Sequence, residues 1–416
     1  MSRAVAIVGS GPSGCYLAQA LLKADPQLRV DILDRLPVPY GLVRYGVAAD
    51  HQGTKAVIRQ FERLFERQGA GFIGNVVVGE DVSLDELRQA YDAVVLATGL
   101  SGDRALGIPG EHLEGVHRAG HLTRALYEHP DAEPLPELGR HVVIMGNGNV
   151  AIDLLRLLAK TPGELAGSDL GPVPTGWLAG SGVETIDIIG RSPAADAKFD
   201  AVMIKELAKL EGVTIDVVGA GASDDEEGAK KIAALESIHG HGTGGRRITF
   251  RFSLTPVSLE GYGGRIGEAV FRNIDGDTVS LPCSAFITAI GFEAAAGLPR
   301  DELVGSAVEL ELGVLADGLY ATGWFRRGPR GTIPDNRTDA QLLAARILAD
   351  LEASDTGLEK PGRHAFPQWT AAVCYDDWKR IDAAETASPP QDRCRVKIPS
   401  REAMLALARQ TKEPDL

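Results

Sequence analysis

Residues 4–14 read AVAIVGSGPSG, a short apolar run followed by three spaced glycines. A continuous apolar run of this length is typical of a strand buried on both faces of a parallel sheet. In the spacing G-x-G-x-x-G, Gly9 makes the turn into a helix, Gly11 admits a pyrophosphate, and Gly14 lets helix and strand pack closely. The stretch predicts the start of a dinucleotide-binding unit.

The next residues complete this unit. Leu17, Ala20 and Leu21 recur at helical spacing, and residues 29–33 form a second apolar strand that ends at Asp34. A carboxylate in this place can accept hydrogen bonds from the hydroxyls of an adenosine ribose. Strand, glycines, helix, strand and acid in this order predict an adenine-nucleotide site, whereas one glycine motif alone would indicate only a tight turn.

A second unit begins with residues 141–151, HVVIMGNGNVA. Here Ala151 takes the place of the third glycine, and Arg191 follows the later strand at 184–189, where the first unit has an acid. A guanidinium can pair with the 2′-phosphate of NADP, which a carboxylate would repel. The pattern therefore favours NADPH over NADH, although Arg191 can also be read as a solvated arginine at a strand end.

Composition limits the remaining possibilities. The chain has 416 residues, 44% of them hydrophobic, and a formal charge of −14, which argues against nucleic-acid or anionic-membrane binding as the main task. Four scattered cysteines contain no C-x-x-C pair and predict neither a disulfide framework nor a metal site. We expect no signal peptide and no membrane span, and hence a cytoplasmic protein.

Several other segments suggest local structure. Residues 94–99, 286–291 and 319–323 each read as a short strand with a glycine exit, which lets the backbone approach a ligand. Residues 54–68 predict one amphipathic helix. We expect surface loops over the Gly/Pro-rich residues 161–182 and the acidic, Gly-rich residues 220–243, and a C-terminal extension over the last fifty residues.

Two nucleotide sites in one chain suggest a flavoprotein that exchanges electrons with a nicotinamide. A disulfide reductase of similar architecture would need a dithiol, and an electron-input subunit of a glutamate-synthase-like complex usually carries cysteine clusters. The chain has neither. A noncatalytic nucleotide-sensing module remains as an alternative of a different class.

Residues 34–51, DRLPVPYGLVRYGVAADH, resemble the segment after the second FAD strand of adrenodoxin-reductase-type ferredoxin–NADP(+) reductases. The resemblance continues at 74–79, 108–111, 146–151, 323–333 and 378–382, in the same order along nearly the whole chain. It implies FAD-dependent oxidation of NADPH and reduction of an iron–sulfur ferredoxin that supplies a monooxygenase system. An NADH-preferring reductase, or an electron-input flavoprotein for another acceptor, stays open as an alternative.

The resemblance also implies an α/β fold with two Rossmann-like, three-layer dinucleotide-binding domains. The FAD domain is expected to be discontinuous, formed by residues 1–105 and by residues 318–416, which include the C-terminal extension. Residues 106–317 are expected to form the NAD(P)-binding domain. No metal is expected.

The motifs and the resemblance together assign the binding residues. Those expected to hold FAD are Gly9, Gly11, Pro12, Ser13, Gly14, Asp34, Arg35, Leu42, Gly46, Val77, Thr98, Gly99, Trp324, Gly331, Thr332 and Ile333. Those expected to hold the nicotinamide dinucleotide are Asn147, Gly148, Asn149, Val150 and Arg191.

Two positions depart from the family pattern. Ser192 stands where a second consecutive arginine is common, and Met203 stands where a carboxylate is often found. Losing one bidentate partner removes on the order of 1–3 kcal/mol of phosphate recognition. NADH is therefore possible as the reductant.

The resemblance further implies that His51 lies near the flavin and is coupled to Glu206, a pair that could hold a proton or orient the nicotinamide. Lys55, Arg59, Arg63 and Arg67 recur every four residues and predict a cationic strip, which could dock an acidic ferredoxin. The alternative is a solvated helix face partly neutralised by Glu62 and Glu66.

Overall fold

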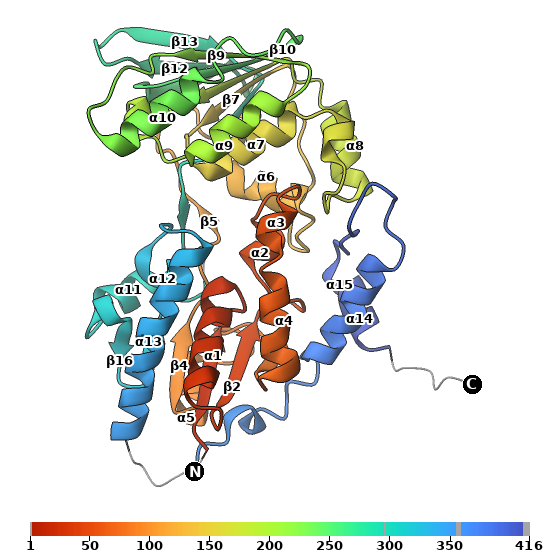
Figure 1. Cartoon of the computed structure of the whole chain (residues 1–416), viewed down its shortest axis with the longest axis vertical. Coiled ribbons are helices and arrows are strands. Elements are labelled where there is room, and N and C mark those ends of the chain that lie inside the picture. Colours follow the sequence, from red (N-terminus) through yellow and green to blue (C-terminus); the bar gives the residue numbers. More distant parts are fainter. Residues whose placement is uncertain (1, 295–296, 355–358, 411–416) are drawn as a thin grey trace. The chain divides into compact units, whose positions relative to one another are not determined.

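The computed structural model describes residues 2–294, 297–354 and 359–410. The chain divides into two compact units (Figure 1). The first unit comprises Met1–Gly102, His129–Asp131 and Phe292–Leu416, and the second comprises Asp103–Glu128 and Ala132–Gly291. The short strands β5 (Gly102–Asp103) and β15 (Phe292–Glu293) stand where the chain passes between them.

The first unit is built on a six-stranded sheet. Its spatial order is β16 (Val314–Ala316), β17 (Leu319–Ala321), β4 (Ala93–Leu96), β1 (Ala4–Val8), β2 (Arg29–Asp34) and β3 (Gly71–Gly74). Every pair is parallel except β16 with β17. The apolar run at 4–8 is therefore a central strand with neighbours on both sides, as its composition predicts.

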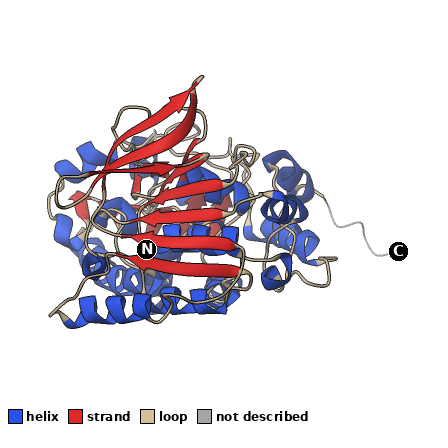
Figure 2. Ribbon diagram, turned by 90° about the horizontal axis from the view of Figure 1, so that it is seen from above, coloured by secondary structure: helices blue, strands red, loops and turns tan. Residues whose placement is uncertain are grey.

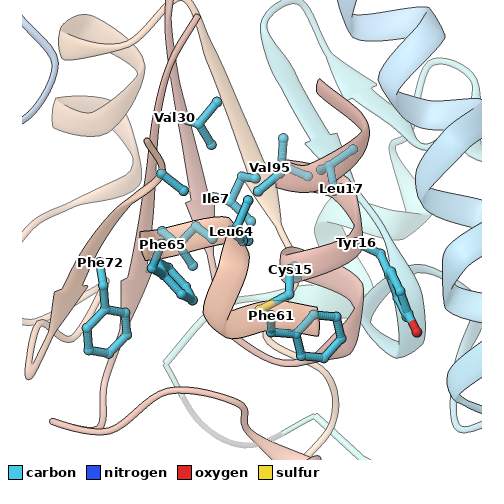
Figure 3. Packing of buried hydrophobic residues seen from close by; sticks show 14 of the residues in the cluster. Ile7, Cys15, Tyr16, Leu17, Val30, Phe61, Leu64, Phe65, Phe72 and Val95 are labelled. Atoms are coloured by element: carbon cyan, nitrogen blue, oxygen red, sulfur yellow. The ribbon is translucent and has the colours of Figure 1, made fainter. Parts of the chain in front are cut away.

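Alternate residues of β1 face two different cores. Val5 and Ile7 belong to a cluster that includes side chains from α1 (Pro12–Ala24), α4 (Ile58–Arg67) and α13 (Ile333–Ala353). Figure 3 shows part of this packing, with Cys15 and Phe61 below Ile7. Ala4, Ala6 and Val8 join the opposite cluster, to which α5 (Leu84–Ala90) contributes. Helices and loops thus cover both faces of the sheet, which makes three layers.

The C-terminal extension is tied to the first unit by a buried ion pair. Arg44, on α2 (Leu42–Tyr45), pairs with Glu385, on α14 (Tyr375–Thr386), and its guanidinium lies 5.0 Å from the centroid of the Trp378 ring. Glu385 also accepts hydrogen bonds from Arg395 at 2.9 Å and from the Ile398 N–H at 3.0 Å. Burial alone would raise the pKa of Glu385, but these partners outweigh it and lower the pKa.

The second unit has its own parallel sheet. Its order is β6 (Val116–Arg118), β14 (Ala285–Thr288), β7 (His141–Met145), β8 (Thr185–Ile189), β10 (Arg246–Arg251) and β9 (Val213–Val218). The helix α7 (Asn149–Ala159) packs on β7 and β8. A three-stranded antiparallel sheet packs on β7 and β14 through a cluster that includes Val143, Phe271 and Phe286. Its strands are β11 (Thr255–Tyr262), β12 (Arg265–Arg272) and β13 (Thr278–Pro282). Figure 2 shows strands in red among helices in blue.

The remaining helices are short. In the first unit they are α3 (Gln52–Lys55), η4 (Leu310–Leu312), α11 (Arg300–Gly305), α12 (Gly323–Arg327), η5 (Gly362–Ala365) and α15 (Arg401–Ala408). In the second they are α6 (Ala119–Leu126), η1 (Pro162–Leu165), α8 (Pro172–Gly180), η2 (Ala194–Asp196), α9 (Ala201–Glu206), η3 (Leu207–Lys209) and α10 (Glu226–Glu236). Over the described ranges, no helix is long and apolar enough to cross a bilayer.

The predicted α/β fold with two Rossmann-like sheets is confirmed, while three local predictions are wrong. Residues 54–68 contain two helices, since α3 ends at Lys55 and α4 begins at Ile58. Residues 161–182 include the helix α8. Its N-cap is Gly171, and the Gly171 N–H donates a hydrogen bond to Glu128 Oε2 at 3.0 Å. Residues 220–243 include the helix α10. Asp225 is the N-cap of this helix, and its carboxylate accepts a hydrogen bond from the Gly228 N–H at 2.9 Å.

The chain returns to the first unit earlier than the boundary we expected at residue 317. The division falls after Gly291. Leu298, Leu303 and Leu310 pack against the cluster on the α5 side of the first sheet, and β16 pairs with β17 in that sheet. These contacts place the described residues 292–294 and 297–317 with the first unit.

Candidate cofactor and coenzyme sites

The predicted FAD residues gather at one edge of the first sheet. Gly9 follows β1, Asp34 ends β2, Thr98 follows β4, and Trp324 lies three residues after β17. These four strands are parallel, so their carboxyl ends meet at the same edge. Open parallel sheets bind their ligands outside this edge.

The first glycine fingerprint combines two tight positions with one open position. Gly9 has φ +114°, and a Cβ there would lie 2.5 Å from the Ala97 carbonyl oxygen. A Cβ on Gly14 would collide with the Gly9 carbonyl oxygen. At Gly11, by contrast, an added Cβ would meet no heavy atom of the described residues within 4 Å. The turn therefore leaves room beside Gly11, as a pyrophosphate requires.

Asp34 is held against this turn. Its carboxylate accepts hydrogen bonds from the Ser10 N–H at 3.0 Å, from the Ser10 hydroxyl, and from the Leu36 N–H at 2.9 Å. The segment that follows Asp34 folds back onto the first fingerprint, since the Tyr40 N–H donates to the carbonyl oxygen of Ser10 at 3.2 Å. A Cβ on Gly41 would lie 3.0 Å from Gly11 Cα. The second strand end and the first fingerprint thus form one structure.

The C-terminal motif joins the same region. Ser13 Oγ donates to Asn336 Oδ1 at 3.0 Å, which links the first turn of α1 to the first turn of α13. Figure 1 shows these two helices side by side. Thr332 caps α13 through a capping box with Asp335, and Trp324 Nε1 donates to the Gly331 oxygen at 3.4 Å. Residues more than 300 positions apart in the sequence therefore meet at two helix N-termini, which favour anionic groups.

Asp339 is a member of this region that the sequence analysis missed. Its Oδ2 accepts from the Thr322 hydroxyl at 2.8 Å and from the Gly323 N–H at 2.9 Å. It also pairs with Arg326 and, at 3.5 Å, with Arg327 Nε. Asp339 is 8% exposed and lies beside the buried Ala340 on α13. The sequence signal for Asp339 is an acid on the apolar face of a helix, which indicates a buried carboxylate with partners. Which residues are its partners follows only from the tertiary structure.

The other predicted FAD residues surround this edge with mixed exposure. Leu42 is 42% exposed, which is unusual for leucine, and it precedes Gly46, the C-cap of α2. The Val77 N–H donates to Asp81 Oδ2 at 2.7 Å. Arg35 pairs with Asp131 at 2.8 Å, so its charge is matched within the first unit. Of the remaining predicted residues, Pro12 begins α1, Thr98 is exposed, Gly99 has a positive φ, and Ile333 begins α13.

The second fingerprint repeats the backbone geometry of the first. Gly146 has φ +124°, and a Cβ there would collide with the Ala289 carbonyl oxygen. Ala151 is fully buried, and Val150 lies in the first turn of α7. An added Cβ on Gly148 would meet only Lys198 Cβ, at 3.8 Å, among the described atoms. The second position is again the open one.

The two asparagines of this fingerprint hold the loop that follows β8. Asn149 Oδ1 accepts from the Asp200 N–H at 2.9 Å, and Asn147 Oδ1 accepts from the Lys198 N–H at 3.4 Å. Asn147 is 8% exposed, and its Nδ2 has no hydrogen-bond partner among the described residues. Arg191 stands exposed at the start of the loop.

The two departures from the family pattern both lie in the second unit. The carbonyl oxygen of Ser192 accepts from the Ser253 N–H at 3.2 Å, so its backbone helps to fix the loop. Met203 lies half-buried on α9, where a thioether replaces a charge. Neither side chain supplies a cation for a phosphate.

His51 and Glu206 lie in different units. His51 precedes α3, and its carbonyl oxygen accepts from the Thr54 and Lys55 N–H groups, both at 3.1 Å. Glu206 ends α9 in the second unit. Both side chains are partly exposed. Their pairing stays a prediction.

Only three of the four residues of the predicted cationic strip are exposed. Lys55 is only 5% exposed, and its Nζ donates to the Arg44 carbonyl oxygen at 3.4 Å. Including Lys55 among the docking residues was therefore wrong, because the break between α3 and α4 interrupts the expected four-residue spacing. Arg59, Arg63 and Arg67 lie exposed on α4.

Cysteines and metal ligands offer no further redox site. Cys15 and Cys283 are buried, and Cys374 and Cys394 are exposed. Burial raises the pKa of both thiols, that of Cys283 to about 12, so neither is a ready thiolate. In the part of the chain that the structure describes, no three His, Cys, Asp or Glu residues are grouped to hold a metal ion.

Comparisons with known proteins cover both units. A family model described as pyridine nucleotide-disulphide oxidoreductase matches residues 3–332. Cindoxin reductase of Citrobacter braakii is 42% identical over 419 residues, covering 97% of this chain and 91% of that protein. NADPH-ferredoxin reductase FprA of Mycobacterium tuberculosis (strain CDC 1551 / Oshkosh) is 35% identical over 450 residues, covering 97% of this chain and 98% of that protein.

The same likeness is found among solved structures. The structure of Mycobacterium tuberculosis FprA in complex with NADPH has a TM-score of 0.91 and 32% sequence identity, covering 98% of this chain and 100% of that one. Thioredoxin reductase of Lactococcus lactis has a TM-score of 0.51 at 16% identity, which is a likeness of fold alone.

Proposed function

The chain belongs to the pyridine nucleotide-disulphide oxidoreductase family, and on this premise we propose that it is an FAD-dependent ferredoxin–NADP(+) reductase. It oxidises NADPH and passes single electrons to an iron–sulfur ferredoxin, which supplies a monooxygenase system. The observation that carries this proposal is the pair of glycine fingerprints, each with its second glycine open to a ligand. The relative named as NADPH-ferredoxin reductase supports a ferredoxin as the acceptor, whereas the relative named as cindoxin reductase is named for a different acceptor.

The first unit is the proposed FAD domain. The N–H groups at the start of α1 and the open side of Gly11 bind the pyrophosphate, and Asp34 accepts from the adenosine ribose. Gly331 and Thr332, at the N-terminus of α13, would hold the flavin part of FAD, and Asp339 fixes the neighbouring turn at Thr322 and Gly323. When bound, FAD accepts a hydride as an electron pair and releases the electrons singly.

The second unit is the proposed coenzyme domain. Asn147, Gly148, Asn149 and Val150 form the start of α7, where a dinucleotide pyrophosphate binds. Arg191 is exposed at the end of β8, where it can pair with a 2′-phosphate. This favours NADPH, while Ser192 and Met203 weaken the preference and leave NADH as a usable second coenzyme.

His51 and Glu206 are proposed to orient the nicotinamide and to tune hydride transfer. The transfer itself needs only close stacking of nicotinamide on flavin and no protein nucleophile. We expect His51→Ala and Glu206→Ala to slow anaerobic flavin reduction in stopped-flow experiments. Unchanged rates in both variants would remove this pair from the mechanism.

A disulfide reductase is not supported as an alternative. That chemistry needs a dithiol beside the flavin, whereas the four cysteines form no C-x-x-C pair and two of them are buried. We propose that the enzyme works in the cytoplasm, as the sequence analysis expects.

The proposal is tested by coupling the purified protein to candidate ferredoxins from the same cell. With NADPH present, catalytic amounts of the yellow protein should reduce an iron–sulfur ferredoxin, which is followed by the change in the ferredoxin spectrum. If the protein consumes NADPH with an artificial acceptor but reduces none of the ferredoxins, the acceptor class is wrong. If the protein oxidises neither NADPH nor NADH with any acceptor, it is a binding module.

A further inference from the structure

The loop between β8 and α9 carries a lysine that no motif singles out. We propose that Lys198 binds the pyrophosphate of the dinucleotide in the second unit, so that it recognises the part that NADPH and NADH share. This inference rests on the proposed function, which assigns the coenzyme to this unit.

The backbone of Lys198 is fixed to the fingerprint itself. Its N–H donates to Asn147 Oδ1 at 3.4 Å, and two residues later the Asp200 N–H donates to Asn149 Oδ1 at 2.9 Å. Asn147 and Asn149 flank Gly148, so these two bonds hold the loop against the turn from β7 to α7. The position of Lys198 is therefore set by the residues that form the nucleotide site.

The side chain of Lys198 starts beside the open glycine. Its Cβ lies 3.8 Å from where a Cβ on Gly148 would stand, and it is the only described atom within 4 Å of that point. In this motif the second glycine is where the backbone approaches the pyrophosphate. An exposed lysine that starts there brings its ammonium group within reach of the phosphate oxygens.

The nearby acid is already matched by another lysine. Glu227, on α10, pairs with Lys231 Nζ at 2.7 Å, and this bond is the main reason for its lowered pKa, with Lys198 a minor contributor. Asp200 directs its carboxylate to the Val202 N–H at 2.8 Å as the N-cap of α9. Lys198 is therefore not committed to an ion pair with either acid.

The start of α7 supplies the second feature that suits a phosphate. The N-cap of α7 is Gly148, which offers no side chain to the N–H groups of the first turn. Such N–H groups and the positive end of the helix dipole favour an anion. A helix N-terminus and an ammonium group beside it together match a diphosphate.

The two cations of the loop then divide the recognition. Arg191, at the end of β8, faces the position of the ribose 2′ substituent and separates NADPH from NADH. Lys198 adds affinity for both coenzymes. This explains how a chain with Ser192 in place of a second arginine can still hold its coenzyme, with weaker selectivity than the family pattern implies.

The test uses the FAD-loaded enzyme and its Lys198→Ala variant. We expect kcat/KM for NADPH and for NADH to fall by a similar factor, about tenfold, with kcat nearly unchanged, since a ground-state phosphate contact is lost. The Kd for NADP(+) from calorimetry should rise by the same factor. Lys198→Arg should restore most of the loss, and Lys209→Ala, which removes an exposed lysine of the same unit, should change nothing.

Two results would overturn the inference. If Lys198→Ala leaves both coenzymes unaffected, the lysine does not touch the dinucleotide. If it lowers kcat/KM for NADPH alone, it binds the 2′-phosphate and not the pyrophosphate. Failure of the proposed function is visible separately, because then the wild-type flavin would be reduced by neither coenzyme.

Discussion

The two glycine fingerprints share one backbone geometry and differ in what surrounds it. In both, the first glycine has a positive φ and its missing Cβ makes room for a carbonyl oxygen, from Ala97 in one unit and Ala289 in the other. At the second strand end, however, the first unit has the bonded carboxylate of Asp34, and the second has the exposed Arg191. On the proposed function, the glycines make a phosphate site in each unit, and the strand end selects the nucleotide.

The surroundings of the two fingerprints also differ, in the way expected for a resident ligand in the first unit and an exchangeable one in the second. Around the first fingerprint, α2 and α13 fold over the turn, and the C-terminal extension is fixed by the buried Arg44–Glu385 pair. Around the second, the loop that follows β8 presents exposed cations. A cofactor that stays needs the first arrangement, and a coenzyme that is exchanged in every turnover needs the second.

The largest difference between the two units should come from replacing the second glycine of each fingerprint by alanine, which adds one methyl group. Gly11→Ala should abolish FAD retention, because the new Cβ occupies the pyrophosphate position without touching the protein. Gly148→Ala should stay yellow but lose most of its reduction by NADPH. Flavin content after gel filtration and stopped-flow reduction measure the two effects.

Gly176→Ala is the matched control, since a Cβ there also meets no described atom within 4 Å and lies on α8, away from either fingerprint. It should keep both flavin and activity. Loss of flavin in Gly148→Ala, with Gly11→Ala still yellow, would reverse the assignment of the two units.

The next largest effect concerns the stability of the first unit. Replacing Glu385 by Gln leaves Arg44 buried without its counter-charge, which should cost about 3–5 kcal/mol of unfolding free energy. Glu385 has a lowered pKa in the folded protein, so its contribution is complete above its unfolded value and is lost as the pH falls through the folded value. The melting temperature should therefore fall as the pH drops below about 4.5, which is the ordinary pKa of a glutamate such as Glu385.

In Glu385→Gln the melting temperature should be lower at neutral pH and less sensitive to acid than in the wild type. A variant that melts like the wild type at neutral pH would show that the extension is held by other contacts.

Coenzyme selectivity should change by a smaller amount. Arg191→Ala should lower kcat/KM for NADPH by about tenfold to a hundredfold and leave NADH nearly unchanged, as expected for a lost charge-assisted phosphate contact. Steady-state kinetics with both coenzymes decide this. A wild-type preference for NADH, or an equal loss for both coenzymes, would contradict the role given to Arg191.

The smallest effect should be on ferredoxin docking. Arg59→Glu and Arg63→Glu reverse two exposed charges on α4 and should slow ferredoxin reduction several-fold, most strongly at low salt. Reduction of a small artificial acceptor provides the control and should not change. If the rate with ferredoxin and its salt dependence stay the same, this face of α4 is only solvated.

Much of the fold could be predicted because its signals are local. Each central strand is a short apolar run, and each glycine exit marks the carboxyl end of a parallel strand, so the ligand edge was readable from residues such as Gly9 and Gly146. The acidic, Gly-rich composition of residues 220–243 predicts a loop, whereas Asp225 and the acids after it stabilise the N-terminus of the helix α10.

The parts that the sequence did not predict depend on tertiary contacts. Lys55 fits a four-residue spacing, but the chain bends between α3 and α4 and buries it. Asp339 and Lys198 belong to no motif, and their partners are brought to them only when the helices and loops pack. Local pattern thus identifies the phosphate sites, and packing determines which charges surround them.

The central claim, that one unit keeps a flavin and the other receives a reducing coenzyme, is tested most directly by anaerobic titration of the purified protein with NADPH. The account predicts a yellow protein whose flavin absorbance is lost as one equivalent of NADPH per chain is added, and restored by two equivalents of an oxidised one-electron ferredoxin. A protein that stays colourless after reconstitution with FAD, or a bound flavin that neither NADPH nor NADH reduces, would contradict it.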